Sequence, residues 1–233
     1  VRVINPDVGG GFGMKAMTYP EYYVVAHAAM ALGRAIRWMA DRTESMLTDN
    51  AGRDLVSDAE IALDADLRIT GYRMKTRCNL GAYNSQFGQI IQTDLFAKVL
   101  TGPYDIPVAH HGVQGFYTNT TPVDAYRGAG RPEAIYVMER LMDRAARELG
   151  IDPWDLRRKN LIAADKFPYR TVAGETYDVG DFIRVLDRAH QVADVAGFGS
   201  RQAASASAGR HYRRMRGNRK HDRRYSDQKW MAD

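Results

Sequence analysis

Two glycine-rich stretches decide how this chain folds: Gly9-Gly10-Gly11-Phe12-Gly13 and Ala125-Tyr126-Arg127-Gly128-Ala129-Gly130-Arg131-Pro132-Glu133. Glycine permits positive φ and lets a ligand approach the backbone closely. The second stretch leads into a helix that we predict over residues 132–149, because its apolar side chains recur at three-and-four spacing. Backbone N–H groups, the helix dipole and two guanidinium groups together predict an anion site there. The same text is also compatible with a surface loop that carries solvated Arg side chains.

The first stretch does not match the common nucleotide-binding loops. It is not a dinucleotide fingerprint, because Ala16 stands where the third Gly belongs. It is not a phosphate loop, because Lys15 is followed by Ala16 rather than by Ser or Thr. Taken alone, it is also compatible with a tight turn between a strand at residues 1–5 and the helix that follows.

Strand and helix signals are mixed along the chain, which predicts an α+β fold with mixed sheets and packed helices. We predict strands at residues 1–5 and 35–39, and a long hairpin over residues 54–78. A helix is predicted to begin near Pro20 with Thr18 as its cap and to end at Gly33. It is apolar nearly all round, so we expect it to be buried on most sides. Shorter helices are predicted over residues 152–161 and 180–193.

The net charge of +5 comes from the end of the chain. Residues 201–233 hold ten Lys/Arg and three Asp/Glu, which leaves 23 basic and 25 acidic side chains for residues 1–200. The first 200 residues therefore carry no basic footprint for nucleic acid. The single cysteine, Cys78, excludes an internal disulfide and a Cys-ligated iron–sulfur cluster in this chain. No apolar run reaches the ~20 residues of a membrane span.

Together, the two glycine-rich stretches resemble two active-site segments of the molybdenum hydroxylase large subunits. This family contains xanthine dehydrogenase, aldehyde oxidase and aerobic carbon monoxide dehydrogenase. The resemblance is collinear to about residue 205, and it continues through Arg37-Trp38, Asp41-Arg42-x-Glu44, Gly81-Ala82-Tyr83, Gly150-Ile151-Asp152-Pro153, Leu156-Arg157-Arg158-Lys159-Asn160-Leu161 and Phe167-Pro168-Tyr169. The order and spacing of so many segments make the resemblance specific.

The resemblance implies a molybdenum–pterin cofactor, in its molybdopterin cytosine dinucleotide form, and hydroxylation with oxygen derived from water. It implies that electrons leave through iron–sulfur clusters on a small subunit and FAD on a medium subunit. The full-length assembly is then a cytoplasmic dimer of heterotrimers, with no nucleic-acid partner and no membrane span. By the same resemblance, the cofactor contacts Gly10, Gly11, Phe12, Gly13, Arg127 and Gly128, with Phe12 and Arg127 nearest the molybdenum.

Departures from the family narrow the substrate. Gly128 stands where the copper-containing carbon monoxide dehydrogenases have a Cys, so the chain resembles the branch that lacks this Cys. Ala16 and Ala129 stand where xanthine dehydrogenases have a carboxylate and an aromatic ring, and an ungapped alignment puts His110 in place of their Arg. With Ala16, His110 and Ala129 as pocket residues, we expect an aldehyde or a non-purine N-heterocycle as substrate.

The family's catalytic Glu lies near the far C-terminus of the subunit, and its metal-facing Gln lies in a segment before the one that matches Val1. We therefore assign no catalytic residue in this chain and expect the chain alone to be inactive. Residues 1–165 are interpreted as the first molybdopterin-binding domain, truncated at its N-terminus. Residues 166–205 begin the connection to the second such domain.

Residues 206–233 form a basic tail with few aliphatic side chains, which we expect to be disordered. Our hypothesis for this composition is a reading-frame shift just after residue 205, and the alternative is a natural basic extension of the chain. Two other interpretations of the protein stay open: an inactive fragment or pseudogene product of the same family, and a nucleic-acid-binding protein that acts through the tail.

Overall fold

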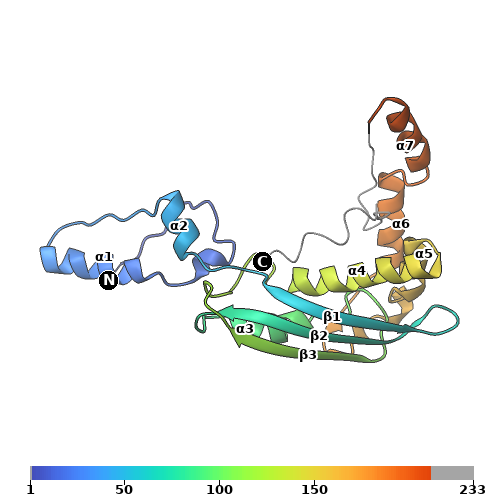
Figure 1. The fold of residues 1–233 in the computed structure, drawn as a ribbon, viewed down its shortest axis with the longest axis horizontal. Helices are drawn as coiled ribbons and strands as arrows, with labels where there is room; N and C mark the ends of the chain where they lie inside the picture. Colours follow the sequence, from blue (N-terminus) through green and yellow to red (C-terminus); the bar gives the residue numbers. More distant parts are fainter. Residues whose placement is uncertain (1, 211–233) are drawn as a thin grey trace. The chain divides into compact units, whose positions relative to one another are not determined.

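The computed structural model describes residues 2–210 (Figure 1). Its helices are η1 Met14–Ala16, α1 Pro20–Leu32, α2 Arg42–Thr48, α3 Gly88–Ile90, the π-helical η2 Ile91–Leu95, α4 Arg131–Leu149, α5 Pro153–Asn160, η3 Ala164–Lys166, α6 Phe182–Val192 and α7 Phe198–Ser207. Its strands are β1 Leu55–Leu63, β2 Ile69–Gly81, β3 Ala109–Tyr117, β4 Tyr169–Arg170 and β5 Thr176–Tyr177. The predicted α+β class is confirmed.

The described residues form two compact units. The first comprises residues 2–58, 74–100 and 110–135, and the second comprises residues 59–73, 101–109 and 136–210. Both glycine-rich stretches belong to the first unit.

Strands β1, β2 and β3 form one sheet in that order. The predicted hairpin is confirmed, and Asp64 organises its turn by accepting the backbone N–H groups of Asp66 and Arg68 at 2.9 and 2.8 Å. β3 runs parallel to β2, because Tyr72 N donates to Val108 O and Thr118 N donates to Gly81 O, both at 2.9 Å. Buried and exposed residues alternate along β2, which fits a sheet with one face in the core.

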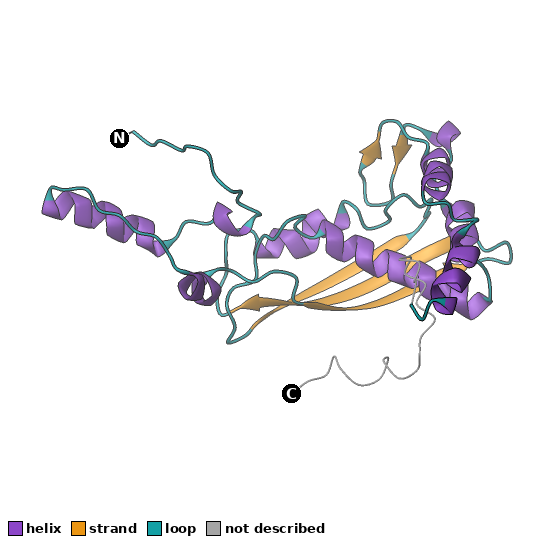
Figure 2. Ribbon diagram, turned by 90° about the horizontal axis from the view of Figure 1, so that it is seen from above, coloured by secondary structure: helices purple, strands orange, loops and turns teal. Residues whose placement is uncertain are grey.

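Helix α4 forms as predicted, with Pro132 in its first turn and Gly150 at φ 70 after its last residue. Its buried side chains follow the predicted spacing: Ala134, Met138, Met142, Ala145 and Ala146. Figure 2 shows α4 as one long continuous helix. The predicted helix over residues 152–161 is α5, and the side chain of Asp152 caps it by accepting Trp154 N at 2.7 Å.

Two predicted strands are wrong. Residues 2–5 and 35–39 run as loop and pair with no strand within residues 2–210. An alternating or apolar run favours extended backbone, but it becomes a strand only where a neighbouring backbone takes its hydrogen bonds. Conversely, α2 was not predicted, although Asp41 and Glu44 form a complete capping box at its start.

Helix α1 has the predicted limits but not the predicted burial. Its N-cap is Tyr19 rather than Thr18, Pro20 is its first residue, and Gly33 ends it at φ 62. Most of its large apolar side chains are exposed, with Tyr23 at 68% and Met30 at 84%. The prediction of a helix buried on most sides is wrong, because none of its residues is buried within residues 2–210, although Trp38 contacts Tyr22 with ring centroids 6.0 Å apart.

The predictions for the end of the chain are tested only in part. The predicted helix over residues 180–193 is α6. Helix α7 was not predicted and closes the described chain. The predictions for residues 211–233 lie outside the described residues. No helix within residues 2–210 has the length and apolarity that a membrane crossing requires.

Candidate cofactor-binding site

The first glycine-rich stretch is an irregular loop that enters η1. Phe12 has a φ of 52 and is 55% exposed. Its ring folds over Gly10, where an added Cβ would lie 2.7 Å from the ring. Gly13 has a φ of 86, and an added Cβ there would lie 2.9 Å from the carbonyl oxygen of Ala125. Glycine at residue 13 therefore allows the two glycine-rich stretches to touch.

The two stretches meet through a backbone hydrogen bond. Arg127 N donates to Phe12 O at 2.9 Å, although the residues are far apart in the sequence. Backbone hydrogen bonds to Ala51 fix the segment before the second stretch. Ala51 N donates to Pro122 O at 3.0 Å, and Asp124 N donates to Ala51 O at 2.9 Å. The structure thus brings together Gly10, Gly11, Phe12, Gly13, Arg127 and Gly128.

The second stretch turns sharply before α4. Gly128, Ala129 and Gly130 have φ values of 100, 42 and 89, so three successive residues lie in the left-handed region. An added Cβ at Gly130 would lie 2.3 Å from the carbonyl oxygen of Ile91, which makes glycine obligatory there. The turn therefore rests directly on the start of the π-helical segment η2, a type of segment that is frequent at functional sites.

The residues present fit a group with electronegative ligands. Within residues 2–210, the backbone N–H groups of Gly10, Gly11, Phe12 and Gly13 donate no hydrogen bond. Positions for a Cβ at Gly9 and Gly11 have no atom within 4 Å, so a ligand can approach the backbone there. Successive free N–H groups in a turn favour an anion or an oxo ligand.

Arg127 adds a positive charge beside these N–H groups. Its side chain is exposed, and its guanidinium has no hydrogen bond or ion pair within the described residues. The described part of the chain also holds no group of three or more His, Cys, Asp or Glu side chains arranged to bind a metal ion.

A polar cluster fixes the end of the first glycine-rich stretch. Lys15 Nζ lies 2.8 Å from Asp49 Oδ1 and 3.0 Å from Tyr19 OH, and Tyr19 also donates to Asp49. Burial of Asp49 opposes its ionisation, but the hydrogen bonds from Lys15 and Tyr19 outweigh this effect and lower its pKa. The hydrogen bond to Asp49 raises the pKa of Lys15. The cluster is therefore charged at neutral pH and ties η1 to the end of α2.

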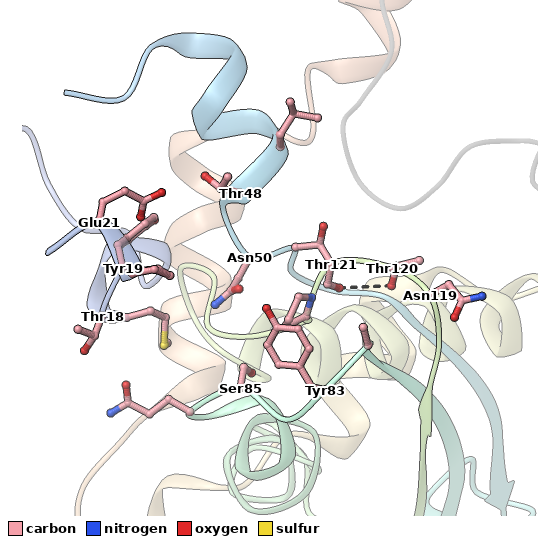
Figure 3. A pocket seen from close by; sticks show the side chains of 16 residues that line it. Thr18, Tyr19, Glu21, Thr48, Asn50, Tyr83, Ser85, Asn119, Thr120 and Thr121 are labelled. Carbon is pink, nitrogen blue, oxygen red and sulfur yellow. Dashed lines mark hydrogen bonds between the residues drawn. The ribbon is translucent and has the colours of Figure 1, made fainter. Parts of the chain in front are cut away.

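The first unit also contains a pocket of about 730 Å³ with a mixed polar and apolar lining (Figure 3). Hydroxyl, amide and phenol side chains line it, among them Asn50, Tyr83 and Thr121. Its lining includes neither Phe12 nor Arg127, so it is distinct from the contact between the two glycine-rich stretches.

The three predicted substrate-pocket residues lie in different places. Ala16 ends η1, and Ala129 sits inside the left-handed turn, where its N–H donates to Tyr126 O at 2.7 Å. His110 lies near the start of β3, seven residues before Tyr117, which puts it ~23 Å along the strand from the end that leads to Arg127. The structure brings Ala129 next to Arg127, and no described contact joins His110 to them; the assignments stay predictions.

Two residues beside the site were missed by sequence reasoning. Arg53 donates to the carbonyl oxygen of Arg127, and Gln92 is a buried side chain on η2 with 2% exposure. The only local sequence feature that could have pointed to Arg53 is the glycine before it. Gln92 lies in a stretch of sequence for which no helix or strand was predicted. Both depend on tertiary contacts.

With this geometry, a family model matches the chain. Residues 1–161 match the molybdopterin cofactor-binding domain. The chain therefore belongs to the molybdopterin-binding large subunits of the molybdenum hydroxylases, as the resemblance implied.

Individual relatives agree with this membership. The carbon monoxide dehydrogenase large chain of Hydrogenophaga pseudoflava is 37% identical over 206 residues, which cover 88% of this chain and 26% of that protein. The nicotine 6-hydroxylase large subunit of Paenarthrobacter nicotinovorans is 34% identical, with 90% of this chain and 26% of that protein covered. Quinoline 2-oxidoreductase from Pseudomonas putida 86 has a similar structure, with a TM-score of 0.80, 33% identity, and coverage of 88% of this chain and 26% of that one. The chain spans about a quarter of the length of these relatives.

Proposed function

We propose that the two glycine-rich stretches form one wall of a molybdenum–pterin cavity in an oxidoreductase that hydroxylates an aldehyde or a non-purine N-heterocycle. The observation that carries this proposal is the hydrogen bond from Arg127 N to Phe12 O, which joins free backbone N–H groups and a free guanidinium in one place. Membership of the molybdopterin-binding family supports the cofactor class.

The chain's own residues would act on the cofactor by hydrogen bonding and charge. When bound, the molybdenum–pterin group supplies two-electron oxidation with oxygen derived from water. The N–H groups of Gly10 to Gly13 would donate to its electronegative ligands, and Arg127 would stabilise negative charge that develops beside it. The ring of Phe12 would form an apolar part of the wall. Phe12 and Arg127 would then lie nearest the metal, with Gly128 beside them.

The substrate class is inferred from the small side chains at two predicted pocket residues. Ala16 and Ala129 offer neither a carboxylate nor an aromatic ring, so a purine would lack both a hydrogen-bond acceptor and a stacking partner. Two relatives carry the names nicotine 6-hydroxylase and quinoline 2-oxidoreductase, which supports an N-heterocycle. His110 stays a proposed pocket residue that the described contacts do not link to Arg127.

A copper-containing site is not expected. Gly128 follows Arg127 and offers no thiolate. Cys78 is 2% exposed on β2, its Sγ lies 3.5 Å from Gln114 O, and burial raises the pKa of its thiol. A buried neutral thiol in a sheet is a poor copper ligand.

The proposal includes the partners and the division of the chain. Iron–sulfur and FAD subunits would take the electrons, in a cytoplasmic dimer of heterotrimers, and the pterin would be the cytosine dinucleotide form. Residues 1–165 would be the first molybdopterin-binding domain and residues 166–205 the start of the connection to the second. Since no residue of this chain is assigned as the catalytic base, the chain alone would not turn over.

The test uses the protein purified from its host with its natural partners. We expect molybdenum and pterin in equal amounts in the large subunit, and turnover of quinoline, nicotine or an aromatic aldehyde in preference to xanthine. With 18O-labelled water, the label should enter the product. Purified protein without molybdenum, or preferred oxidation of xanthine or carbon monoxide, would contradict the proposal.

A further inference from the structure

Arg53 contacts three parts of the second glycine-rich stretch, although it lies 74 residues before Arg127. Its guanidinium donates to the carbonyl oxygen of Arg127. It stacks over the ring of Tyr126, 4.5 Å from the ring centroid. Its Nε lies 3.5 Å from Oε1 of Glu133 in the first turn of α4. One planar side chain therefore spans the loop from the residue before Arg127 to the helix after it.

The backbone near Arg53 is closely fitted to this contact. An added Cβ at Gly52 would lie 2.6 Å from Cβ of Tyr126. Arg53 has a φ of 61, a value that costs about 1 kcal/mol or more for a residue other than glycine. The hydrogen bonds between Ala51 and the segment that leads to Tyr126 hold this conformation. The strained backbone of Arg53 therefore directs its guanidinium onto the second glycine-rich stretch.

Glu133 supplies a second reason for a cation at this position. Its side chain is only 6% exposed, against 29% for Arg53. A buried carboxylate without a paired charge is strongly destabilising. Arg53 thus has two separable roles, because it neutralises Glu133 and it holds the carbonyl oxygen of Arg127.

We infer that Arg53 is a positioning residue of the cofactor site: it fixes the backbone of Arg127, so that the Arg127 guanidinium stays free to meet the cofactor. This inference rests on the proposed function. Lysine would keep the charge of Arg53, but it lacks the planar fork that stacks on Tyr126 while it donates to a carbonyl.

The experiment separates the two roles in the full-length protein with its natural partners. The variants are Arg53→Met, Glu133→Gln, the double variant Arg53→Met/Glu133→Gln, and Arg53→Lys. The control is Arg73→Met, since Arg73 pairs with Glu60 at the surface, where the two side chains are 56% and 66% exposed. We expect Arg53→Met to lower the melting temperature and Glu133→Gln to restore it in the double variant.

The decisive readouts come from the folded double variant. We expect kcat to fall by about tenfold or more with little change in KM, since a misplaced Arg127 would lose an interaction with charge that develops only in the transition state. Amide hydrogen exchange of residues 127–131 should be faster by about tenfold or more than in the wild type. The kcat and the exchange rates of Arg53→Lys should lie between those of the wild type and those of the double variant. Arg73→Met should match the wild type in every readout.

A double variant with wild-type kcat and wild-type exchange would overturn the inference, because Arg53 would then serve only to neutralise Glu133. Hydrogen exchange does not need a loaded cofactor. If the wild-type protein holds no molybdenum, the proposed function fails, while slow exchange of residues 127–131 in the wild type and fast exchange in the double variant would still support the role of Arg53.

Discussion

At the scale of single residues, close backbone contacts define the candidate site more than side-chain chemistry does. Gly130 is the clearest case, because its missing Cβ leaves room for the carbonyl oxygen of Ile91. Gly130→Ala should therefore combine a conformational cost with a steric clash, and we expect a loss of about 2 kcal/mol or more in the free energy of unfolding. Urea denaturation of the purified protein measures this loss.

Gly174 provides a matched control for Gly130. Its φ is 92, against 89 for Gly130, but an added Cβ meets no atom within 4 Å. Gly174→Ala should show only the conformational cost, about 1 kcal/mol. Equal losses for the two variants would show that contact with Ile91 does not matter.

His111 should make stability depend on pH. It stacks on Phe96, with ring centroids 4.8 Å apart. Burial, with a smaller effect of neighbouring His110, lowers the pKa of His111 below its ordinary value of 6.5. Folding therefore favours the neutral ring, so its stabilisation is complete above pH 6.5 and decreases at lower pH, where the unfolded chain gains a proton that the folded chain does not.

His111→Phe should flatten the fall in melting temperature as the pH drops below 6.5. His27→Gln is the control, because His27 is an exposed residue of α1. An unchanged pH profile in His111→Phe would rule out His111 as the source of the dependence.

Sequence reasoning identified the residues of the two glycine-rich stretches but not the side chains that hold them. Glycine repeats and the Arg in the loop are local signals, and the family resemblance then singled out Phe12 and Arg127 before their contact was visible. Arg53 gave no comparable signal, because its function depends on a partner 74 residues away and on a positive φ that only the fold imposes. Long-range ion pairs of this kind have no sequence period.

At the scale of elements, Arg157 joins α5 to α4 in the second unit. Its Nε donates to Glu139 Oε2 at 2.7 Å, one of its terminal nitrogens lies 2.8 Å from Asp143 Oδ1, and Tyr104 donates to Glu139 Oε1 at 2.7 Å. The side chain of Asp143 is only 3% exposed. Arg157→Met would leave that carboxylate unpaired, so we expect a loss of about 3–5 kcal/mol in the free energy of unfolding.

Arg144→Met tests whether this loss is specific. Arg144 pairs with Glu148 on the exposed side of the same helix, where the two side chains are 73% and 65% exposed. Thermal unfolding should not distinguish this variant from the wild type, since surface pairs contribute little. A small effect of Arg157→Met would mean that water or another cation replaces the lost guanidinium.

Elements with their own boundary signals were predicted well. The hairpin β1–β2 carries alternation and an acidic turn, and α4 carries a three-and-four period between Pro132 and Gly150. The strand predicted at residues 35–39 and the predicted burial of α1 were wrong. A run of apolar residues alone does not show which other segment will pair with it or cover it. β3 was missed, since its pairing partner β2 lies far away in the sequence.

At the scale of the whole molecule, the family membership allows a prediction about the cofactor. We expect mild acid hydrolysis of the purified protein to release cytidine monophosphate in equal amount to molybdenum. Chromatography of the released nucleotides, with metal analysis of the same sample, measures this ratio. Release of guanosine or adenosine monophosphate, or of no nucleotide, would contradict the cytosine dinucleotide form.

The hydrogen bond between Arg127 and Phe12 also has a consequence for biosynthesis. Closing a loop of that length is slow compared with forming a local turn, because chain entropy opposes it. During translation, the nascent chain displays Phe12 long before Arg127 has emerged from the ribosome. We therefore expect the contact between the two glycine-rich stretches to form only after residue 127 has left the ribosome, so that a shorter nascent chain would lack this wall of the site.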